Sequence, residues 1–219
     1  MMGRQNKEIP VYVFMGFLES GKTTFAKETL MDRGFTGGAK TLLLACEDGE
    51  EEYDLEALKK ANIYTEFIEE DQLTTDHLLD LQDKYNPEQV MIEYNGMWKL
   101  DKIFEIRVPK GWTVVQVISF VNAETYDVYS QNMKATMVEQ FNSADMVIFN
   151  RCDENSKIPE WRRSIKAVNR RAQIIFEMKD GSIAPETNEP EDLPYDVSAD
   201  VIELPDDDFG IWYVDASDM

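Results

Sequence analysis

The stretch Gly16-Phe17-Leu18-Glu19-Ser20-Gly21-Lys22-Thr23 fits the pattern G-x-x-x-x-G-K-[ST] at every defined position. A short apolar segment at 9–15, which is typical of a buried strand, precedes it, and a predicted helix over 22–32 follows it. This strand–loop–helix context is the one that a phosphate-binding loop, or P-loop, requires. Glycines let such a loop wrap tightly, and the helix N-terminus adds positive potential for an anion.

Each part of the loop has an expected role toward a nucleoside triphosphate. Lys22 would bridge the β- and γ-phosphates, and the Thr23 hydroxyl would be a ligand of Mg²⁺. The rest of the phosphate cradle is expected from Gly16, Glu19, Ser20, Gly21 and Thr24. The alternative is a glycine loop that matches the pattern by chance.

Strands and helices are predicted to alternate along the chain on both sides of this loop. Apolar, β-branched-rich segments predict strands at 9–15, 40–46, 63–68, 89–93, 113–121, 145–149 and 173–178. Helical patterns occupy 22–32, 54–61, 74–85, 97–107, 123–131, 133–143 and 159–171. Strands that are apolar throughout are typical of a parallel sheet covered on both faces. We therefore expect an α/β, three-layer P-loop NTPase fold with a mainly parallel sheet.

A second polar motif, Asn150-Arg151-Cys152-Asp153, ends the strand predicted at 145–149. It is similar to the guanine-reading pattern N-K-x-D, with Arg in place of Lys. Asp153 would accept hydrogen bonds from the N1 and N2 groups of guanine, Asn150 would tie the base loop together, and the Arg151 stem would lie over the purine. An ordinary polar turn at a strand end is the alternative interpretation.

A third motif, Glu93-Tyr94-Asn95-Gly96, ends the strand predicted at 89–93. At this position P-loop enzymes carry an acid for the Mg²⁺ shell and a glycine that faces the γ-phosphate. Glu93 and an acid from the stretch 47–50, with Glu47 first, are the candidates for the Mg²⁺ shell and for placing water. An exposed glutamate in a turn is the alternative.

Composition restricts the class of protein. The 219 residues suffice for one ordinary core, and the chain shows no apolar run long enough to span a membrane. A net charge of -21 repels phosphate backbones, so we expect no nucleic-acid partner. Two cysteines that are distant in sequence favour a cytoplasmic protein with reduced thiols.

The acidic residues are unevenly distributed, and this suggests a division of the chain. No Lys or Arg follows Lys179, and Pro and acidic residues are frequent up to an aromatic run at 209–214. We expect a nucleotide-binding domain over 1–178. Residues 179–219 are expected to form an acidic linker or arm that ends in a short strand, which would be the stub of a further domain or dock on the main sheet.

Taken together, the stretches GFLESGKTT, IEYNG and FNRCD resemble the CobW-type GTPases, which include the HypB and UreG nucleotide-binding domains. The stretches ACEDGEEEYD, ISFVNAETY and QFNSADMVIFNRCD agree with this resemblance. It covers about 9–178 and implies GTP and GDP as ligands, slow hydrolysis, and a nucleotide-gated homodimer. It also implies a metallochaperone or cofactor-assembly role toward a metalloprotein client.

The chain departs from that family at one metal motif. Members usually carry Cys-x-Cys-Cys at a place that corresponds here to Glu69-Glu70-Asp71-Gln72, where thiols are missing. Oxygen ligands suit Mg²⁺ better than zinc, so the identity of any transition metal stays open. Cys46 lies near the expected phosphate edge, where it could join Glu47 and Glu50.

Two other functions fit the same residues. In one, GTP occupancy changes affinity for a partner and turnover is negligible, which makes the chain a regulatory nucleotide-binding module. In the other, the guanine motif is a coincidence and the chain is an ATP-dependent enzyme. The preferred expectation remains a GTPase with Lys22, Glu93 and Glu47 as its catalytic candidates.

Overall fold

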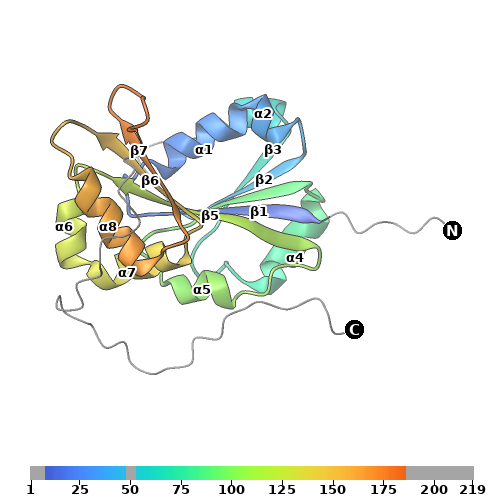
Figure 1. Ribbon diagram of the computed structural model, residues 1–219. Coiled ribbons are helices and arrows are strands. Elements are labelled where there is room, and N and C mark those ends of the chain that lie inside the picture. Colours follow the sequence, from blue (N-terminus) through green and yellow to red (C-terminus); the bar gives the residue numbers. More distant parts are fainter. Residues whose placement is uncertain (1–7, 48–52, 186–219) are drawn as a thin grey trace, which may run out of the picture. The chain divides into compact units, whose positions relative to one another are not determined.

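The computed structural model describes residues 8–47 and 53–185, and within them seven strands form one sheet in the order β3-β2-β4-β1-β5-β6-β7 (Figure 1). All six pairings are parallel. The strands are β1 (Ile9–Met15), β2 (Thr41–Ala45), β3 (Ile63–Phe67), β4 (Gln89–Glu93), β5 (Trp112–Asn122), β6 (Met146–Cys152) and β7 (Gln173–Met178). The expected α/β P-loop fold is confirmed.

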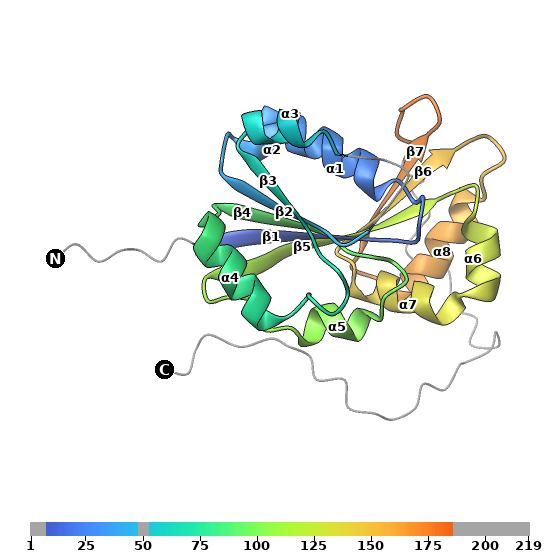
Figure 2. The same cartoon turned by 180° about the vertical axis from the view of Figure 1, so that it is seen from behind.

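Helices cover both faces of the sheet and make it the middle of three layers (Figures 1 and 2). One face carries α1 (Lys22–Met31), α2 (Arg33–Thr36) and α3 (Leu55–Lys60). The other face carries α4 (Thr75–Tyr85), α5 (Leu100–Glu105), α6 (Tyr126–Asn132), α7 (Lys134–Ser143) and α8 (Ile158–Val168).

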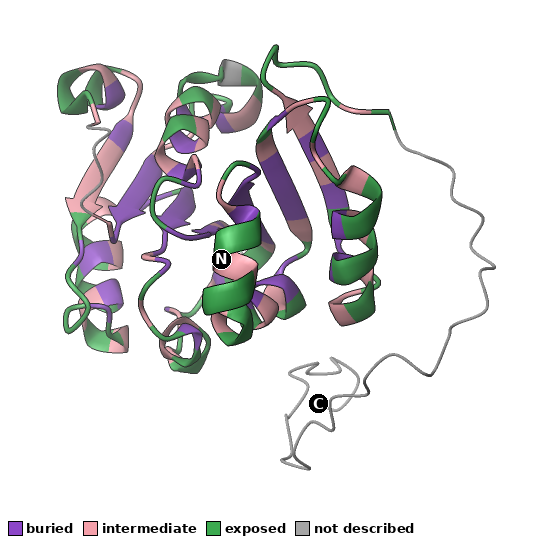
Figure 3. Ribbon diagram, turned by 90° about the vertical axis from the view of Figure 1, so that its left-hand side faces the viewer, coloured by how far each residue is buried: buried purple, intermediate pink, exposed green. Residues whose placement is uncertain are grey.

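The central strand β1 shows how the sequence produces this layering. Val11, Val13 and Met15 point to the face with α4 and α5, whereas Phe14 points to the face with α1. Successive side chains of a strand alternate between the two faces of a sheet, so a strand covered on both sides must be apolar throughout. Figure 3 shows the result as buried central strands beneath half-exposed helices.

Several predicted element ends need correction, and local side-chain hydrogen bonds explain them. The helix expected over 97–107 begins only at Leu100, because Asn95 accepts a hydrogen bond from the Met97 N–H and holds a turn. The helix expected over 159–171 runs over Ile158–Val168. Asn169 then accepts hydrogen bonds from two following N–H groups, which ends the helix.

The C-terminal part of the chain is only partly described. Residues 179–182 turn the chain after β7, and an antiparallel bridge joins Glu177 to Ile183. The segment 186–219, with the strand predicted at 209–214, lies outside the described residues. The division into a domain at 1–178 and an arm at 179–219 therefore stays a prediction.

No helix within 8–47 and 53–185 is both long enough and apolar enough to cross a membrane.

Candidate functional site

The three sequence motifs converge beyond the carboxyl ends of the parallel strands, and two glycines mark where they touch. A Cβ on Gly96 would lie 1.9 Å from the Gly16 carbonyl oxygen, so the loop after β4 packs directly on the P-loop. A Cβ on Gly21 would lie 2.3 Å from Nδ2 of Asn150, so the carboxyl end of β6 also packs on the P-loop. Side chains at either glycine would separate the loops.

Lys22 lies at the centre of the P-loop in a fully buried network. Its Nζ donates to the carbonyl oxygens of Gly16 at 2.8 Å and Phe17 at 2.9 Å. It also forms an ion pair with Oε2 of Glu47 at 2.6 Å, and the two side chains are 1% and 5% exposed. Burial raises the pKa of the Glu47 carboxyl, and the Lys22 ammonium opposes that rise. The lysine is therefore already directed into the loop that it is expected to serve.

Glu93 lies at the end of β4 and joins the P-loop to residues from elsewhere in the sequence. The Thr23 hydroxyl donates to Oε1 of Glu93, and the Tyr53 hydroxyl donates to Oε2 at 2.6 Å. Burial and the neighbouring Glu93 raise the pKa of the Tyr53 phenol, so it remains a neutral donor. Oε1 of the Glu93 carboxyl is thus held at the Thr23 hydroxyl and Oε2 at the Tyr53 hydroxyl. Carboxylate and hydroxyl oxygens are ligands that suit Mg²⁺.

Three polar atoms at this junction are buried but have no hydrogen-bond partner among the described residues. They are Oγ of Ser20, Oε1 of Glu47 and Oδ1 of Asn150. In addition, Gly21 provides no side-chain cap for the first N–H groups of α1. Buried polar groups without partners cost about 1–3 kcal/mol each, and their presence in one place fits a polar ligand there. The Ser20 hydroxyl and the first N–H groups of α1 can donate to a phosphate oxygen. Oε1 of Glu47 and Oδ1 of Asn150 can only accept, so they fit water molecules around Mg²⁺ or an N–H donor of a ligand. Together the residues fit a nucleotide phosphate with its hydrated Mg²⁺.

The carboxyl end of β6 is attached to the P-loop by two hydrogen bonds. Nδ2 of Asn150 donates to the Ser20 carbonyl at 2.7 Å, and the Arg151 guanidinium donates to the Glu19 carbonyl at 3.0 Å. Arg151 adopts a positive φ of 56°, and its side chain reaches the P-loop at Glu19. These contacts place the predicted base-reading motif next to the predicted phosphate-binding motif.

Asp153 lies further out, in an exposed part of the site. Its Oδ1 accepts a hydrogen bond from the Asn155 N–H at 3.0 Å, and its Oδ2 forms an ion pair with Lys179 at 3.2 Å. The hydrogen bond from Lys179 holds the pKa of the Asp153 carboxyl below its usual range. A cavity beside it is lined by Ala123, Glu124, Asp127, Arg151, Asp153, Asn155, Ser156, Lys157 and Trp161.

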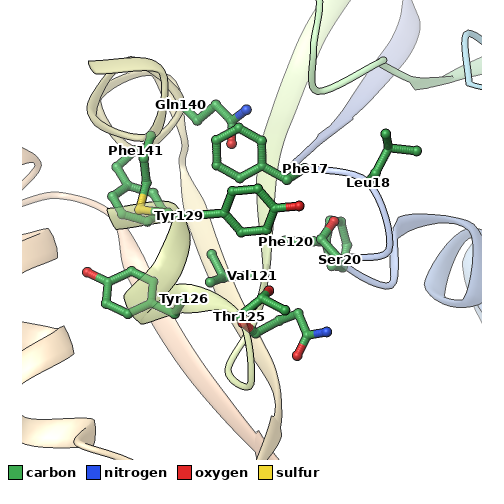
Figure 4. Close-up of a pocket in the computed structure, with 12 residues that line it drawn as sticks. Phe17, Leu18, Ser20, Phe120, Val121, Thr125, Tyr126, Tyr129, Gln140 and Phe141 are labelled. Atoms are coloured by element: carbon green, nitrogen blue, oxygen red, sulfur yellow. Dashed lines mark hydrogen bonds between the residues drawn. The ribbon is translucent and has the colours of Figure 1, made fainter. Parts of the chain in front are cut away.

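A second, small cavity beside the P-loop is lined mainly by apolar and aromatic side chains (Figure 4). Phe17 of the P-loop stacks on Tyr129 of α6, with ring centroids 4.4 Å apart and planes 10° from parallel. About 10 Å³ of space remains, which is at the lower limit for one water molecule. This region anchors the P-loop on α6 and is too small for an organic ligand.

The structure brings most of the predicted site residues together. Gly16, Gly21, Lys22, Thr23, Glu47, Glu93 and Gly96 surround the phosphate-binding loop, and Asn150 and Arg151 join it through Ser20 and Glu19. Asp153 lies apart in the cavity described above. Thr24 is exposed on the first turn of α1, and Glu50 lies outside the described residues.

Sequence reasoning missed three residues of the site. Tyr53 holds Glu93, Lys179 holds Asp153, and the buried side chain of Gln140 approaches the Gly96 carbonyl at 3.5 Å. Tyr53 lies 40 residues from its partner in sequence and Lys179 lies 26 residues away. For Lys179, there was one local indication in the sequence: the residue directly follows the strand predicted at 173–178, the next strand in the chain after the one that ends in the base-reading motif.

Comparisons with known proteins give a family from one match and the fold from solved structures. A family model described as the CobW/HypB/UreG nucleotide-binding domain matches residues 10–176. The Zn(II)-bound YjiA GTPase from E. coli has a TM-score of 0.57 and 22% identity; the match covers 76% of this chain but only 57% of YjiA. The hydrogenase maturation factor HypB from Archaeoglobus fulgidus has a TM-score of 0.56 and 19% identity over 82% of this chain and 86% of HypB. The search of curated proteins found no match.

The reactivity of the Cys46 thiol tests whether the interior beside Glu47 and Glu93 is shielded from solvent. Burial, with Glu93 and Glu47 nearby, raises the pKa of its thiol to about 12, and burial raises that of Cys152 to about 11. An unfolded thiol has a pKa of about 8.5, so around that pH only the unfolded chain carries appreciable thiolate. We expect the folded chain to resist iodoacetamide and the urea-unfolded chain to react at both cysteines, as read by mass spectrometry. Rapid alkylation of folded Cys46 would contradict the described packing.

Proposed function

The chain belongs to the family of CobW/HypB/UreG nucleotide-binding domains, and on this premise we propose that it binds Mg²⁺·GTP and hydrolyses it slowly to GDP and phosphate. We further propose that this cycle serves metal delivery or cofactor assembly. The family shows nucleotide binding in general; GTP as the nucleotide, its hydrolysis, and the role in metal delivery or cofactor assembly are what we propose.

We propose GTP and not ATP as the ligand because the base-reading motif is hydrogen-bonded to the phosphate loop. Asn150 and Arg151 hydrogen-bond to the carbonyls of Ser20 and Glu19, and Asp153 follows two residues after Arg151, so these bonds keep the motif close to the P-loop. A carboxylate can accept from both N–H groups on the N1/N2 edge of guanine, whereas adenine lacks both donors. The motif is therefore positioned to select guanine while the P-loop holds the phosphates.

The residues around the P-loop have distinct roles in the proposed reaction. Lys22 and the first N–H groups of α1 stabilise negative charge on the transferring phosphoryl group. Thr23 and Glu93 would hold Mg²⁺, which neutralises charge on the phosphate oxygens when it is bound. Tyr53 fixes the orientation of the Glu93 carboxyl. Glu47 lies against Lys22, where it orients the ammonium and can act on water near the phosphates.

The proposed metal role rests on the family and on its named neighbours, one of which carries Zn(II) and one of which matures hydrogenase. Within 8–47 and 53–185, three or more His, Cys, Asp or Glu side chains do not gather in a metal-binding group. The stretch 69–72 instead forms a turn in which the Glu69 N–H donates to Gln72. We therefore propose that transition-metal ligands come from residues outside this part, from a second copy of the chain, or from a client metalloprotein.

The same proposal places the protein in the cytoplasm as a GTP- and GDP-responsive homodimer. Support comes from the two cysteines, both of which are free and buried, and from the family resemblance. The net charge of -21 argues against a nucleic-acid partner.

The first test replaces Lys22 by Met. Loss of charge-assisted hydrogen bonds to the phosphates should weaken GTP binding roughly a hundredfold or more, and single-turnover hydrolysis of GTP should disappear. Isothermal titration with GTP and Mg²⁺ measures the first effect, and release of phosphate from a stoichiometric complex measures the second. If the wild type binds GTP tightly but never releases phosphate, the chain is a regulatory module without turnover.

A second variant keeps this test interpretable. The single change Lys22→Met leaves the Glu47 carboxylate buried without its partner, which should lower the free energy of unfolding by about 3–5 kcal/mol. The double variant Lys22→Met/Glu47→Gln removes both charges and should unfold in urea nearer to the wild type, yet still fail to bind GTP. Tight GTP binding by this folded double variant would contradict the proposed role of the P-loop.

The second test concerns the base. Asp153→Ala should weaken binding of GDP by roughly tenfold to a hundredfold and reduce discrimination against ADP. Asp83→Ala is a matched control, since Asp83 is an exposed carboxylate on α4; it should leave both nucleotide affinities unchanged. Equal affinity of the wild type for GDP and ADP would show that the chain is not a guanine-specific protein.

The third test concerns metal. Because carboxylates and one amide replace the family's thiolates at 69–72, the isolated chain should take up one Mg²⁺ with GTP and no Zn²⁺ tightly. Titration of metal-free protein against a zinc-competing dye, with GTP and with GDP, measures this. Stoichiometric uptake at nanomolar free zinc would refute the expectation, and loss of that uptake in Cys46→Ser would then locate the site.

A further inference from the structure

Lys179, the last basic residue of the chain, lies beside the carboxylate that is proposed to read guanine. Its Nζ is 3.2 Å from Oδ2 of Asp153 and 2.9 Å from Oε1 of Glu124. The three side chains come from the loops after β7, β6 and β5, which are neighbouring strands. They form a charged triad at the rim of the cavity lined by Glu124 and Asp153.

The backbone, and not the ion pair alone, places Lys179 there. Cys152 of β6 pairs with Met178 of β7, so Asp153 and Lys179 are the next residues along two adjacent parallel strands. The Lys179 N–H donates to the Cys152 carbonyl at 2.9 Å and extends the pairing by one residue. The Met178 N–H donates to the Ser182 carbonyl at 2.7 Å, and Gly181 with φ of 81° completes the turn. The Lys179 backbone therefore stays next to Asp153 when the ion pair opens, which keeps the ammonium within reach of the base site.

The guanine edge presents three groups in a row: the N2 amino donor, the N1–H donor and the O6 acceptor. A carboxylate can accept from the first two and cannot serve the third, which needs a donor immediately beside that carboxylate. Resting on the proposed GTP function, we propose that Lys179 donates a hydrogen bond to O6 of guanine and is a specificity-determining residue of the base site.

The ammonium group can fill this role without giving up its present partners. It has three N–H donors, which suffice for Glu124, Asp153 and a guanine O6 together. The hydrogen bonds to Glu124 and Asp153 raise the pKa of Lys179, so it remains charged at neutral pH. Adenine presents an amino donor where guanine presents O6, so an ammonium at this position repels adenine while it attracts guanine.

The test replaces Lys179 by Met, which keeps the length of the side chain and removes the donor. Lys84→Met is the matched control, because Lys84 is similarly exposed, pairs with Glu66 and lies at the β3 edge of the sheet. Dissociation constants are measured for GDP, ADP and 6-thioguanosine diphosphate, in which sulfur, a weaker acceptor, replaces O6. Urea unfolding of each variant confirms that it is folded.

We expect Lys179→Met to weaken GDP binding by roughly tenfold to a hundredfold and to leave ADP binding unchanged or slightly tighter. The wild type should bind the 6-thio analogue more weakly than GDP, whereas Lys179→Met should bind the two alike, because the contact to O6 is gone. Lys84→Met should behave as the wild type with all three nucleotides.

Three other outcomes separate the ways in which the inference can fail. If Lys179→Met binds GDP as well as or better than the wild type, Lys179 is only a competitor for Asp153 and the inference is wrong. If the variant loses affinity equally for GDP and the 6-thio analogue and the wild type does not distinguish the two, Lys179 acts through Asp153 alone, and the inference is again wrong. If the wild type does not prefer GDP to ADP, the proposed guanine-specific function itself fails.

Discussion

The buried ion pair between Lys22 and Glu47 is the interaction on which the rest of the site depends. These two charges are almost fully removed from water and must stay paired. Because Glu47 follows β2 and Lys22 begins α1, the end of β2 must lie beside the start of α1. The same lysine holds two P-loop carbonyls, so the loop is closed around it. Because Gly96 packs on Gly16, the loop after β4 must also approach the P-loop, and Glu93 reaches Thr23.

The site has two parts with different physical character. Around the P-loop the functional side chains are buried, and hydrogen bonds between side chains hold them. Around Asp153 they are exposed, and ion pairs in contact with water hold them. Charged contacts in the first part act in a low effective dielectric and are strong, whereas those in the second are screened. Phosphate recognition should therefore dominate affinity, and the exposed part should mainly decide which base is accepted.

The parts of the fold and site that could be predicted from the sequence are those encoded locally. The P-loop pattern, the apolar strands and the family resemblance were confirmed, because each depends on residues that are close in sequence. Helix ends shifted where single side chains, such as Asn95 and Asn169, bond to the backbone. The partnerships of Tyr53 with Glu93 and of Lys179 with Asp153 needed the strand order, because the partners meet only when distant strands lie side by side.

The hydrogen bond between Asn150 and the Ser20 carbonyl joins residues that are 130 positions apart in sequence. This separation affects the order in which the chain folds during synthesis. During synthesis the phosphate loop leaves the ribosome long before the strand that anchors the base loop. Contacts of such long range form late, because chain entropy must be overcome first. A ligand stabilises only a state that can bind it, so GTP would assist only the last stage of folding. The earlier stages must rely on the pairing of the strands that precede β6, namely β1 to β5.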